Sequence, residues 1–303
     1  MNTDKTACIA NKIYFLIVNY NSSGLIVRLI KSIDDNDREN CYVVIVNNSS
    51  EDKGLSTIKG KFIKVIESQV NLGFGKACNL GLNWIGSKNN QAIVWLLNPD
   101  AYFDLDLNKE ASPISTTKAF FQEHPEISIL GTTVYNCEGK ITSVGGTFTP
   151  DTAALTIVDR LPKDLSQDYT ETDWVSGCSL LINLGNFAEV PQFCDRFFLY
   201  YEDLDFCLRY GQQGHKIAAT HFLKVVHDTS SITNRNIWQK YRHITQSYLV
   251  YIEKYGSRKT FILTNIRMLL NTIRLLVIKP KQGFGKLIGI YEYWQNKYKK
   301  YLF

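Results

Sequence analysis

Residues 12–24 read Lys-Ile-Tyr-Phe-Leu-Ile-Val-Asn-Tyr-Asn-Ser-Ser-Gly, a continuous apolar run that is followed at once by turn-forming residues. An apolar run of this length is typical of a strand that is buried on both faces of a parallel sheet. The residues beyond it have the spacing of a helix, with apolar side chains at Ile26, Leu29, Ile30 and Ile33. The segment therefore predicts a buried strand, a polar turn and a helix.

The same cycle repeats through the first hundred residues. Tyr42–Val46, Phe62–Ile66 and Ala92–Leu97 are predicted strands, and Ala77–Ile85 is a predicted helix. Strands that alternate with helices predict an α/β fold with a mostly parallel sheet and helices on both faces. Ligands of such sheets bind beyond the carboxyl ends of the strands. We therefore expect the functional site at the Asn-, Ser- and Asp-rich turns that follow the first, second and fourth strands.

The second half of the chain changes character. Short strand-like pieces occur at Ile129–Val134 and Trp174–Ile182. From Asn236 the pattern is helical to the end, with interruptions predicted at Pro280 and Gly283 because these residues disfavour a helix interior. The sequence therefore predicts an α/β body followed by a helical C-terminal segment.

Composition excludes several classes of protein. Of the 303 residues 45% are hydrophobic and 21% are charged, which excludes a disordered or collagen-like chain. The seven cysteines are an odd number and contain no CxxC pair, so we expect a reducing compartment and neither a disulfide framework nor a structural zinc site. The first residues lack the pattern of a signal peptide. No apolar stretch of about 18 residues is uninterrupted, so no membrane span is expected.

Charge is distributed unevenly. The segment from Lys254 to Phe303 holds 11 Lys and Arg against one acid, Glu292, a net charge of +10, whereas the rest of the chain is at −5. A stripe of apolar residues lies within the same segment and suits a helix in a membrane interface. The alternative is a helix packed on the body or on a partner chain. The stripe consists of Phe261, Ile262, Ile266, Leu269, Leu270, Ile273, Leu276 and Val277, with Arg267, Arg274 and Lys279 nearby.

Carboxylates stand at two positions that favour chemistry. Asp100 comes just past a buried strand, where a carboxylate can bind a divalent cation or, alternatively, serve as a turn former. Glu202, Asp203 and Asp205 open an amphipathic helix that Gly214 ends. A helix N-terminus stabilises an ionised carboxylate, as a general base requires, although ordinary helix capping gives the same pattern.

Two further features are weak when taken alone. His227 follows an apolar pair, and a lone His of this kind is most often a structural residue. Asn71–Gly75 is a glycine-containing turn before a helix that can place N–H groups against a phosphate, but it lacks the full dinucleotide fingerprint. The aromatic and basic residues at 291–301 belong to no recognisable nucleic-acid module, so no nucleic acid is expected as a partner.

The ordered combination of six motifs resembles glycosyltransferase family 2, most closely its rhamnosyltransferase-like branch. The resemblance spans about residues 12–255. The motifs are Val18–Ser22 (VNYNS), Val46–Ser50 (VNNSS), Asn71–Phe74 (NLGF), Leu97–Asp100 (LNPD), Trp174–Gly177 (WVSG) and Phe198–Asp205 (FLYYEDLD).

This resemblance implies a GT-A fold, a nucleotide-sugar donor, Mg²⁺ or Mn²⁺ as cofactor, and inversion at the anomeric carbon. We expect a catalytic domain over residues 1–235, with a nucleotide-sugar half at about 12–105 and an acceptor half at about 106–235. Residues 236–303 would form the helical, basic and amphipathic region. An acidic body with a basic tail indicates peripheral attachment to an anionic membrane surface, and a homodimer contact through the helices is left open.

The resemblance also implies roles for individual residues. Asp203, with Glu202 beside it, matches the catalytic base, and Asp100 and His227 match the metal ligands. Asn98 replaces the first carboxylate of the family's metal motif and Asn47 replaces an Asp, and each replacement removes a negative charge. Trp174 and Gly177 would lie on the acceptor side. The donor site would consist of Val18, Asn19, Asn21, Asn47, Ser49, Asn71, Gly73, Asn79 and Asn98.

Three functions fit these features. The first is transfer of a sugar, rhamnose from dTDP-rhamnose in the leading interpretation, to a saccharide or polyprenyl-diphosphate-linked acceptor in bacterial polysaccharide or O-antigen synthesis, on the cytoplasmic face of the inner membrane. UDP-galactofuranose, UDP-galactose and UDP-N-acetylglucosamine are alternative donors. The second is a GT-A binding module without turnover, which Asn98 and Asn47 would favour. The third, a nucleotidyltransferase, would need an early glycine-rich basic loop that the sequence lacks.

Overall fold

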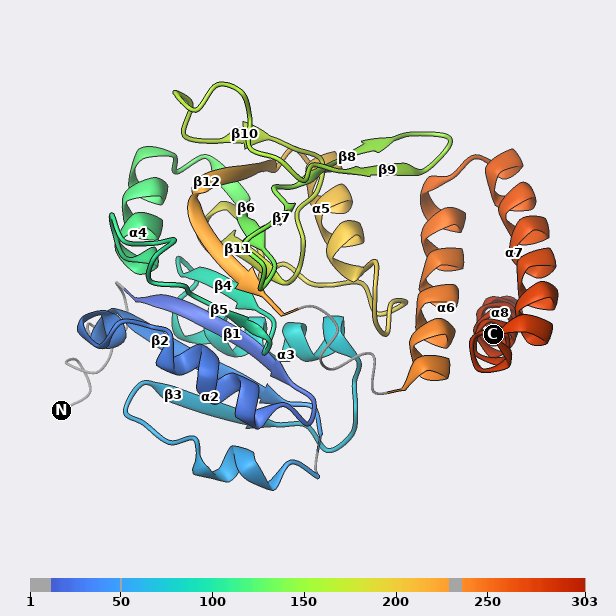
Figure 1. The fold of residues 1–303 in the computed structure, drawn as a ribbon, viewed down its shortest axis with the longest axis horizontal. Helices are drawn as coiled ribbons and strands as arrows, with labels where there is room; N and C mark the ends of the chain where they lie inside the picture. The colour runs from blue at the N-terminus through green and yellow to red at the C-terminus, as the bar shows by residue number, and fades with distance from the viewer. Residues whose placement is uncertain (1–11, 50, 229–235, 303) are drawn as a thin grey trace.

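The computed structural model describes residues 12–49, 51–228 and 236–302. Its body is a curled sheet with helices on both faces, and three further helices stand beside that body (Figure 1). The strand order of the main sheet is β10-β12-β6-β11-β4-β1-β2-β3, with β5 paired to β12 and β7 paired to β6. A separate hairpin consists of β8 and β9.

The half of the sheet around β1 is entirely parallel. It comprises β1 (Ile13–Asn19), β2 (Cys41–Asn47), β3 (Ile63–Glu67) and β4 (Ile93–Leu97). All seven residues of β1 are buried, as its uninterrupted apolar run predicts. The carboxyl ends of these strands meet at one edge, and the polar turns that follow them therefore come together.

The other half of the sheet is mixed. β11 inserts antiparallel between β4 and β6, whereas β12 runs parallel to β6. The predicted strand Trp174–Ile182 is shorter in the structure, because only Ser179–Asn183 joins the sheet. The remaining strands are β5 (Ala101–Tyr102), β6 (Ile127–Tyr135), β7 (Ile141–Ser143), β8 (Gly146–Thr149), β9 (Ala154–Ile157), β10 (Thr170–Glu171), β11 (Ser179–Asn183) and β12 (Lys216–His227).

Two helices cover each face of the sheet. On one face α2 (Ser23–Lys31) and α4 (Pro113–Glu123) contribute Leu29 and Phe120 to a core with the strands. On the other face α3 (Phe74–Lys88) and α5 (Glu202–Gln212) contribute to a second core. This sandwich of helix, sheet and helix agrees with the predicted α/β architecture with helices on both faces.

The C-terminal segment forms three helices, α6 (Ile237–Tyr255), α7 (Arg258–Ile278) and α8 (Pro280–Leu302). The predicted interruption at Pro280 is confirmed, and this proline begins α8. The predicted interruption at Gly283 is wrong, because Gly283 lies inside α8. Its missing Cβ permits close packing, since an added Cβ would lie 2.4 Å from the backbone nitrogen of Leu276. The sequence reading also missed the break at Gly256 and Ser257, where the Ser257 side chain caps α7.

Helix α6 is fastened to the body by buried polar contacts. Asp205 of α5 is fully buried and accepts a hydrogen bond from the Tyr255 hydroxyl over 2.8 Å. The same carboxylate forms an ion pair with Lys254. The Ser247 hydroxyl donates to the carbonyl oxygen of Leu199 over 2.8 Å. These contacts fix α6 against α5 and the loop that precedes it.

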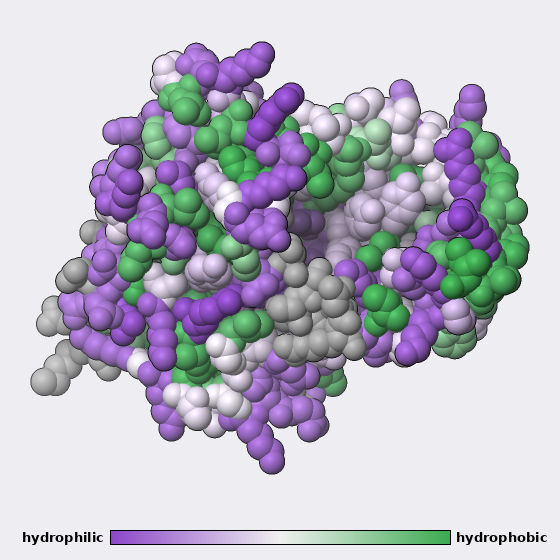
Figure 2. Space-filling model, viewed as in Figure 1, coloured by the Kyte–Doolittle hydropathy of each residue, from purple (hydrophilic) through white to green (hydrophobic). Residues whose placement is uncertain are grey.

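Helix α7 is long and apolar enough to cross a membrane, by length and composition only, which is weak evidence. The sequence reading expected no such segment because two arginines interrupt the apolar run. In the structure only 11% of its apolar window is buried, and Figure 2 shows apolar side chains along the outer edge of the C-terminal helices. The exposed residues are Ile262, Leu263, Ile266, Leu269, Leu270, Ile273, Leu276, Val277 and Ile278.

Candidate active site

A pocket of about 940 Å³ lies between the polar edge of the sheet and helices α6 and α8. Figure 2 shows the molecule hollowed between the body and the C-terminal helices. Seven of the residues predicted from the sequence line this pocket, namely Val18, Asn21, Asn71, Gly73, Asn98, Asp100 and His227. The structure therefore brings together side chains from turns after β1 and β4, from the loop before α3 and from the end of β12.

Asp100 and His227 are neighbours at the sheet edge. The Nε2 atom of His227 lies 3.1 Å from Oδ1 of Asp100, and the same nitrogen lies 3.3 Å from Nδ2 of Asn98. Burial opposes protonation of His227, but the hydrogen bonds and charges of Asp100 and Cys178 together outweigh that effect and raise the imidazole pKa to about 10. The short strand β5 pairs with β12 and places His227 opposite Ala101, directly beside Asp100.

The donor atoms at this position fit a divalent metal. Asp100 offers a carboxylate oxygen, which suits Mg²⁺ and Mn²⁺, and His227 offers an imidazole nitrogen, a ligand of transition metals. Asn98 presents its Nδ2 atom to His227, so its amide oxygen would reach a metal only with the amide turned over. A second group that could hold a metal, Glu123, His124 and Asp168, was not anticipated from the sequence. It involves the end of α4, away from the residues that line the pocket.

A network of buried amides organises the turn after β1. Asn19 is fully buried, and its Nδ2 atom donates to Oδ1 of Asn47 over 3.0 Å and to Oδ2 of Asp52 over 3.2 Å. Its Oδ1 atom accepts from the backbone nitrogen of Ser22 over 3.1 Å. Asn47 donates in turn to Glu67 over 2.7 Å. Asn19 and Asn47 therefore hold the turns in place behind the pocket and do not line it.

Ser49 has a similar position. Its hydroxyl accepts from the backbone nitrogen of Asn21 over 2.9 Å, and this contact supports the left-handed backbone of Asn21 at φ 49°. Asp52, which the sequence reading missed, accepts from both the backbone and the hydroxyl of Ser23. The sequence did contain an indication of this role, because an acidic residue that follows a strand by a few positions can reach the N-terminus of a neighbouring helix.

The loop before α3 lies directly against the loop before α5. The backbone nitrogen of Phe74 donates to the carbonyl oxygen of Phe198 over 2.8 Å. Gly73 has φ 80°, and an added Cβ would lie 2.4 Å from that same oxygen, so only glycine fits. Asn48, another residue that the sequence reading did not select, donates to Asn71 over 2.9 Å and lines the pocket. Asn79 instead fastens α3 to Phe193.

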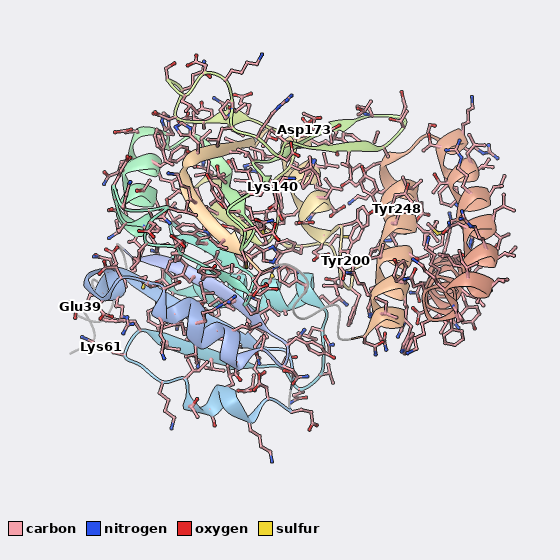
Figure 3. The ribbon with its side chains drawn as sticks, viewed as in Figure 1. Glu39, Lys61, Lys140, Asp173, Tyr200 and Tyr248 are labelled. Atoms are coloured by element: carbon pink, nitrogen blue, oxygen red, sulfur yellow. The ribbon has the colours of Figure 1, made fainter. Side chains whose placement is uncertain are left out.

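The start of α5 has an unusual backbone. Tyr200 and Tyr201 adopt left-handed conformations in succession, at φ 71° and 66°. Such strain costs on the order of 1 kcal/mol or more per residue and is concentrated at functional sites. Tyr200 lines the pocket, whereas Tyr201 stacks on Tyr251 of α6. Figure 3 shows Tyr200 at the edge of the body, between the sheet and α6, and Tyr248 on α6.

The predicted base lies beside the pocket. Oδ2 of Asp203 accepts a hydrogen bond from the backbone nitrogen of Gly177 over 2.8 Å. Four predicted site residues do not line the pocket, namely Asp203, Gly177, Glu202 and Trp174. Burial raises the pKa of Asp203, although the N–H groups of Gly177 and Leu204 act in the opposite direction. Burial also raises the pKa of Glu202 well above its usual range, and the charge of Asp203 adds to that shift. The roles of these four residues stay predictions.

The far wall of the pocket was missed by sequence reasoning. It is formed by polar residues of α6 and α8, including Gln239, Arg242, His243 and Gln246, which recur at helical spacing. The only available signal was this run of polar residues on one helix face, and an exposed helix face has the same appearance.

Comparison with known proteins connects this geometry to a family. Residues 14–139 match the family model described as Glycosyl transferase family 2. The chain is 25% identical over 252 residues to the low-salt glycan biosynthesis hexosyltransferase Agl10 of Haloferax volcanii, covering 82% of this chain and 74% of that protein. It is 23% identical over 244 residues to the rhamnosyltransferase WbbL of Escherichia coli K12, covering 75% of this chain and 87% of that protein.

A solved structure confirms the fold class. GalNAc-T7, whose structure contains UDP, GalNAc and Mn²⁺, superposes with a TM-score of 0.55 at 12% identity. The match covers 84% of this chain and 56% of the GalNAc-T7 chain. The predicted GT-A architecture with a C-terminal helical segment is thereby confirmed.

Proposed function

We propose that this chain, which belongs to glycosyltransferase family 2, transfers a sugar from a nucleotide-sugar donor to a hydroxyl group of a saccharide or lipid-linked acceptor. The observation that carries the proposal is the convergence of Asp100 and His227 with the Asn71–Gly73 loop in one pocket at the carboxyl edge of the sheet. A ligand site at this edge is what an open α/β sheet favours.

The donor would occupy the sheet side of the pocket. Val18, Asn21, Asn48 and Asn71 line that side, and the three asparagines have amide groups that can pair with a base or a ribose. Asn47 would act from behind, by holding Asn19 and the turn. We propose dTDP-rhamnose as donor because of the likeness to the rhamnosyltransferase WbbL. Because the chain is also similar to the hexosyltransferase Agl10, UDP-galactofuranose, UDP-galactose and UDP-N-acetylglucosamine stay as alternative donors.

Asp100 and His227 would hold Mg²⁺ or Mn²⁺ beside the donor, with Asn98 as a neutral neighbour. The metal would supply charge stabilisation for the diphosphate that leaves. The GalNAc-T7 structure contains Mn²⁺ together with UDP, which supports this assignment by analogy of fold. Because Asn98 carries no charge, metal affinity should be lower than at a site with two carboxylates.

Asp203 would accept the proton of the attacking hydroxyl. Inversion requires that the hydroxyl approach from the face of the sugar opposite the diphosphate, and α5 begins two residues after Tyr200, which lines the pocket. The hydrogen bonds from the backbone of Gly177 and Leu204 favour the ionised carboxylate. Glu202, which is buried with an unpartnered Oε2 atom among the described residues, would shape the position of Asp203.

We also propose that α7 attaches the enzyme to an anionic membrane surface on the cytoplasmic side. Its exposed apolar residues form one outward face, and Arg258, Lys259, Arg267, Arg274 and Lys279 are interspersed with or flank them. Basic residues add about 1 kcal/mol each at an anionic surface. A lipid-linked acceptor would be reached from that position. A homodimer through the same face is the alternative outcome.

A thermal-shift panel of nucleotides and nucleotide sugars, with and without Mg²⁺ or Mn²⁺, tests the proposal. A ligand at 100 times its Kd stabilises a protein by about 2.7 kcal/mol. We expect a metal-dependent shift with dTDP or UDP compounds, followed by release of the nucleoside diphosphate from the donor. Binding without any transfer or hydrolysis would favour the GT-A binding module, and no shift with any compound would contradict the proposed function.

A further inference from the structure

The far wall of the pocket is a distinct surface. We define the α6–α8 wall as Gln239, Arg242, His243 and Gln246 of α6 together with Glu292 and Asn296 of α8. The four residues of α6 lie at spacings of three and four, and so do the two of α8, which places each set on one helix face. All six lie outside the residues 14–139 that match the family model. We propose that this wall binds an uncharged saccharide, the acceptor, across the pocket from the donor; the inference rests on the proposed function.

The two charged residues of the wall, Arg242 and Glu292, are matched to each other, while Lys240 of α6 also lines the pocket and makes a contact of its own. Nε of Arg242 donates to Oε2 of Glu292 over 2.7 Å, and Nη2 donates to Oε1 over 2.5 Å, a two-pronged ion pair. Nη1 of Arg242 donates to the Gln239 amide oxygen over 3.1 Å. The guanidinium group is thus occupied by an acid and an amide of its own wall. A wall with this pairing suits a neutral ligand better than a diphosphate, since a phosphate group would have to displace Glu292.

Other polar groups of the wall have hydrogen-bonding capacity to spare. Within the part of the chain that the structure describes, the Gln246 and Asn296 amides have no hydrogen-bond partner, and Nδ1 of His243 is buried without one. Burial, with the charge of Arg242, lowers the pKa of His243 to about 4, so the imidazole is neutral and offers one donor and one acceptor. Amides and neutral imidazoles match sugar hydroxyls, which donate and accept at once.

Aromatic rings complete the surface. The imidazole of His243 stacks on the ring of Phe198, with centroids 4.6 Å apart and planes at 20°. Phe198 and Tyr200 line the same pocket. A sugar ring presents apolar C–H groups on its face and hydroxyls at its rim, and therefore fits a site that combines aromatic rings with amides. The wall and the adjoining rings of Phe198 and Tyr200 supply both within one pocket.

The wall is also rigid enough to select a ligand. Gly285 and Gly289 let α8 pack closely on α6, because an added Cβ would lie 2.2 Å from the carbonyl oxygen of Trp238 and 2.4 Å from that of Arg242. Asp205 and Leu199 hold α6 against the body from the other side. The pocket volume of about 940 Å³ is near the upper end of the roughly 300–1,000 Å³ that small-molecule pockets occupy, which leaves room for a second ligand.

Saturation-transfer NMR on the full chain tests the inference. The enzyme is first saturated with Mg²⁺ and dTDP or UDP, and the methyl glycosides of glucose, galactose, N-acetylglucosamine and rhamnose are then added. We expect at least one glycoside to bind the wild type. Two variants should each bind that glycoside about fivefold more weakly, because each loses one neutral hydrogen bond to it. They are His243→Phe, which keeps the stacked ring, and Gln246→Leu. Gln122→Leu, an exposed position on α4, is the matched control and should bind like the wild type.

The outcomes separate the two proposals. Each variant's Kd for the nucleoside diphosphate is measured in parallel, and we expect the wild-type value. If the nucleotide binds but no glycoside does, or if both variants bind glycosides as well as the wild type, the saccharide wall is overturned while the donor site stands. If the nucleotide itself does not bind the wild type, the proposed function fails and takes this inference with it. Two variants are used so that a folding defect in one leaves the other as the test.

Discussion

The Nε2 atom of His227 lies 3.1 Å from Oδ1 of Asp100, although 127 positions separate the two residues in the chain. The pairing of β5 with β12 produces this contact, and the backbone nitrogen of Asp228 donates to the carbonyl oxygen of Asp100 over 3.0 Å. Arg28 reinforces it from α2 through an ion pair with Asp228 at 3.4 Å. The two candidate ligands are therefore held by backbone as well as by side chains.

Replacing Asp100 with Asn should weaken metal binding. The variant keeps the shape of the side chain but loses the charge that attracts a divalent cation, so we expect at least a tenfold loss, since even indirect supporting residues contribute about 10- to 100-fold. The measurement is a Mn²⁺ titration of the thermal shift that a nucleoside diphosphate produces. Asp106→Asn, on the exposed loop after β5, is the control. An unchanged titration in Asp100→Asn would remove Asp100 from the metal site.

Replacing Asp203 with Asn should abolish transfer but preserve donor binding. The amide retains an oxygen that can accept from Gly177, but it cannot take a proton, and loss of a general base typically costs about 10²- to 10⁴-fold. Turnover and nucleotide Kd are measured together. Asp195→Asn, an exposed residue in the loop before α5, should leave both unchanged. A variant that retains more than about a tenth of wild-type turnover would exclude Asp203 as the base.

The pH dependence of turnover should show the environment of Asp203. Burial raises the pKa of this carboxyl, and the proposed role as base would require its ionised form. Activity should therefore fall as the pH drops through that raised pKa, so the acid limb should lie above the ordinary Asp value of about 3.9. The profile of turnover under saturating donor gives the pKa of the bound enzyme. An acid limb at or below the ordinary value would contradict the assignment.

Replacing Asp205 with Ala should destabilise the fold. The carboxylate is fully buried and interacts with Arg209 over 2.7 Å, with Lys254 and with Tyr255. Breaking such a pair should cost roughly 3 kcal/mol, the lower end for buried pairs, because both basic side chains are partly exposed. Urea unfolding measures the loss. Asp35→Ala breaks the exposed pair with Arg38 and should cost much less; equal losses would mean that α6 is not fastened through Asp205.

Charged substitutions on α7 should release the protein from membranes. Leu270 and Val277 are 63% and 81% exposed, so Leu270→Glu and Val277→Glu should change stability by only about 0.5 kcal/mol or less. Each removes apolar contact and adds repulsion from anionic lipid, and we expect at least a tenfold loss of vesicle binding for the pair. Co-sedimentation with vesicles of anionic and neutral lipid is the measurement. If the wild-type protein does not bind vesicles but elutes as a dimer in gel filtration, this face of α7 contacts a partner chain instead.

Much of the fold followed from periodicity. The apolar run of β1 predicted its burial, and the alternation of strands and helices predicted the helices on both faces of the sheet. Prediction weakened where tertiary contacts decide the outcome. Gly283 was expected to interrupt a helix, but it lies within α8 because close packing on α7 uses its missing side chain. Trp174 was expected in a strand, but in the structure it forms an isolated bridge to Gly146 instead.

The candidate site was predictable only in part. Asn19 and Asn47 were expected to contact a ligand, because both occur in polar turns at strand ends. The structure instead places them in a buried amide network, whereas Asn48, one residue further, lines the pocket. A side chain in such a turn can point inward or outward, and sequence pattern does not distinguish the two.

The sequence by itself determined the alternation of elements, the polar strand ends and the ordered motifs that resemble glycosyltransferase family 2, because each of these depends on local spacing and residue type. Only the tertiary structure decided that Asp100 meets His227, that Asp203 turns toward Gly177, and that α6 and α8 close the pocket with a polar wall. These contacts join segments far apart in the chain. They depend on strand pairing and helix docking. The free energy of these steps comes from burial of apolar surface across the whole molecule, so no single segment of the sequence determines it.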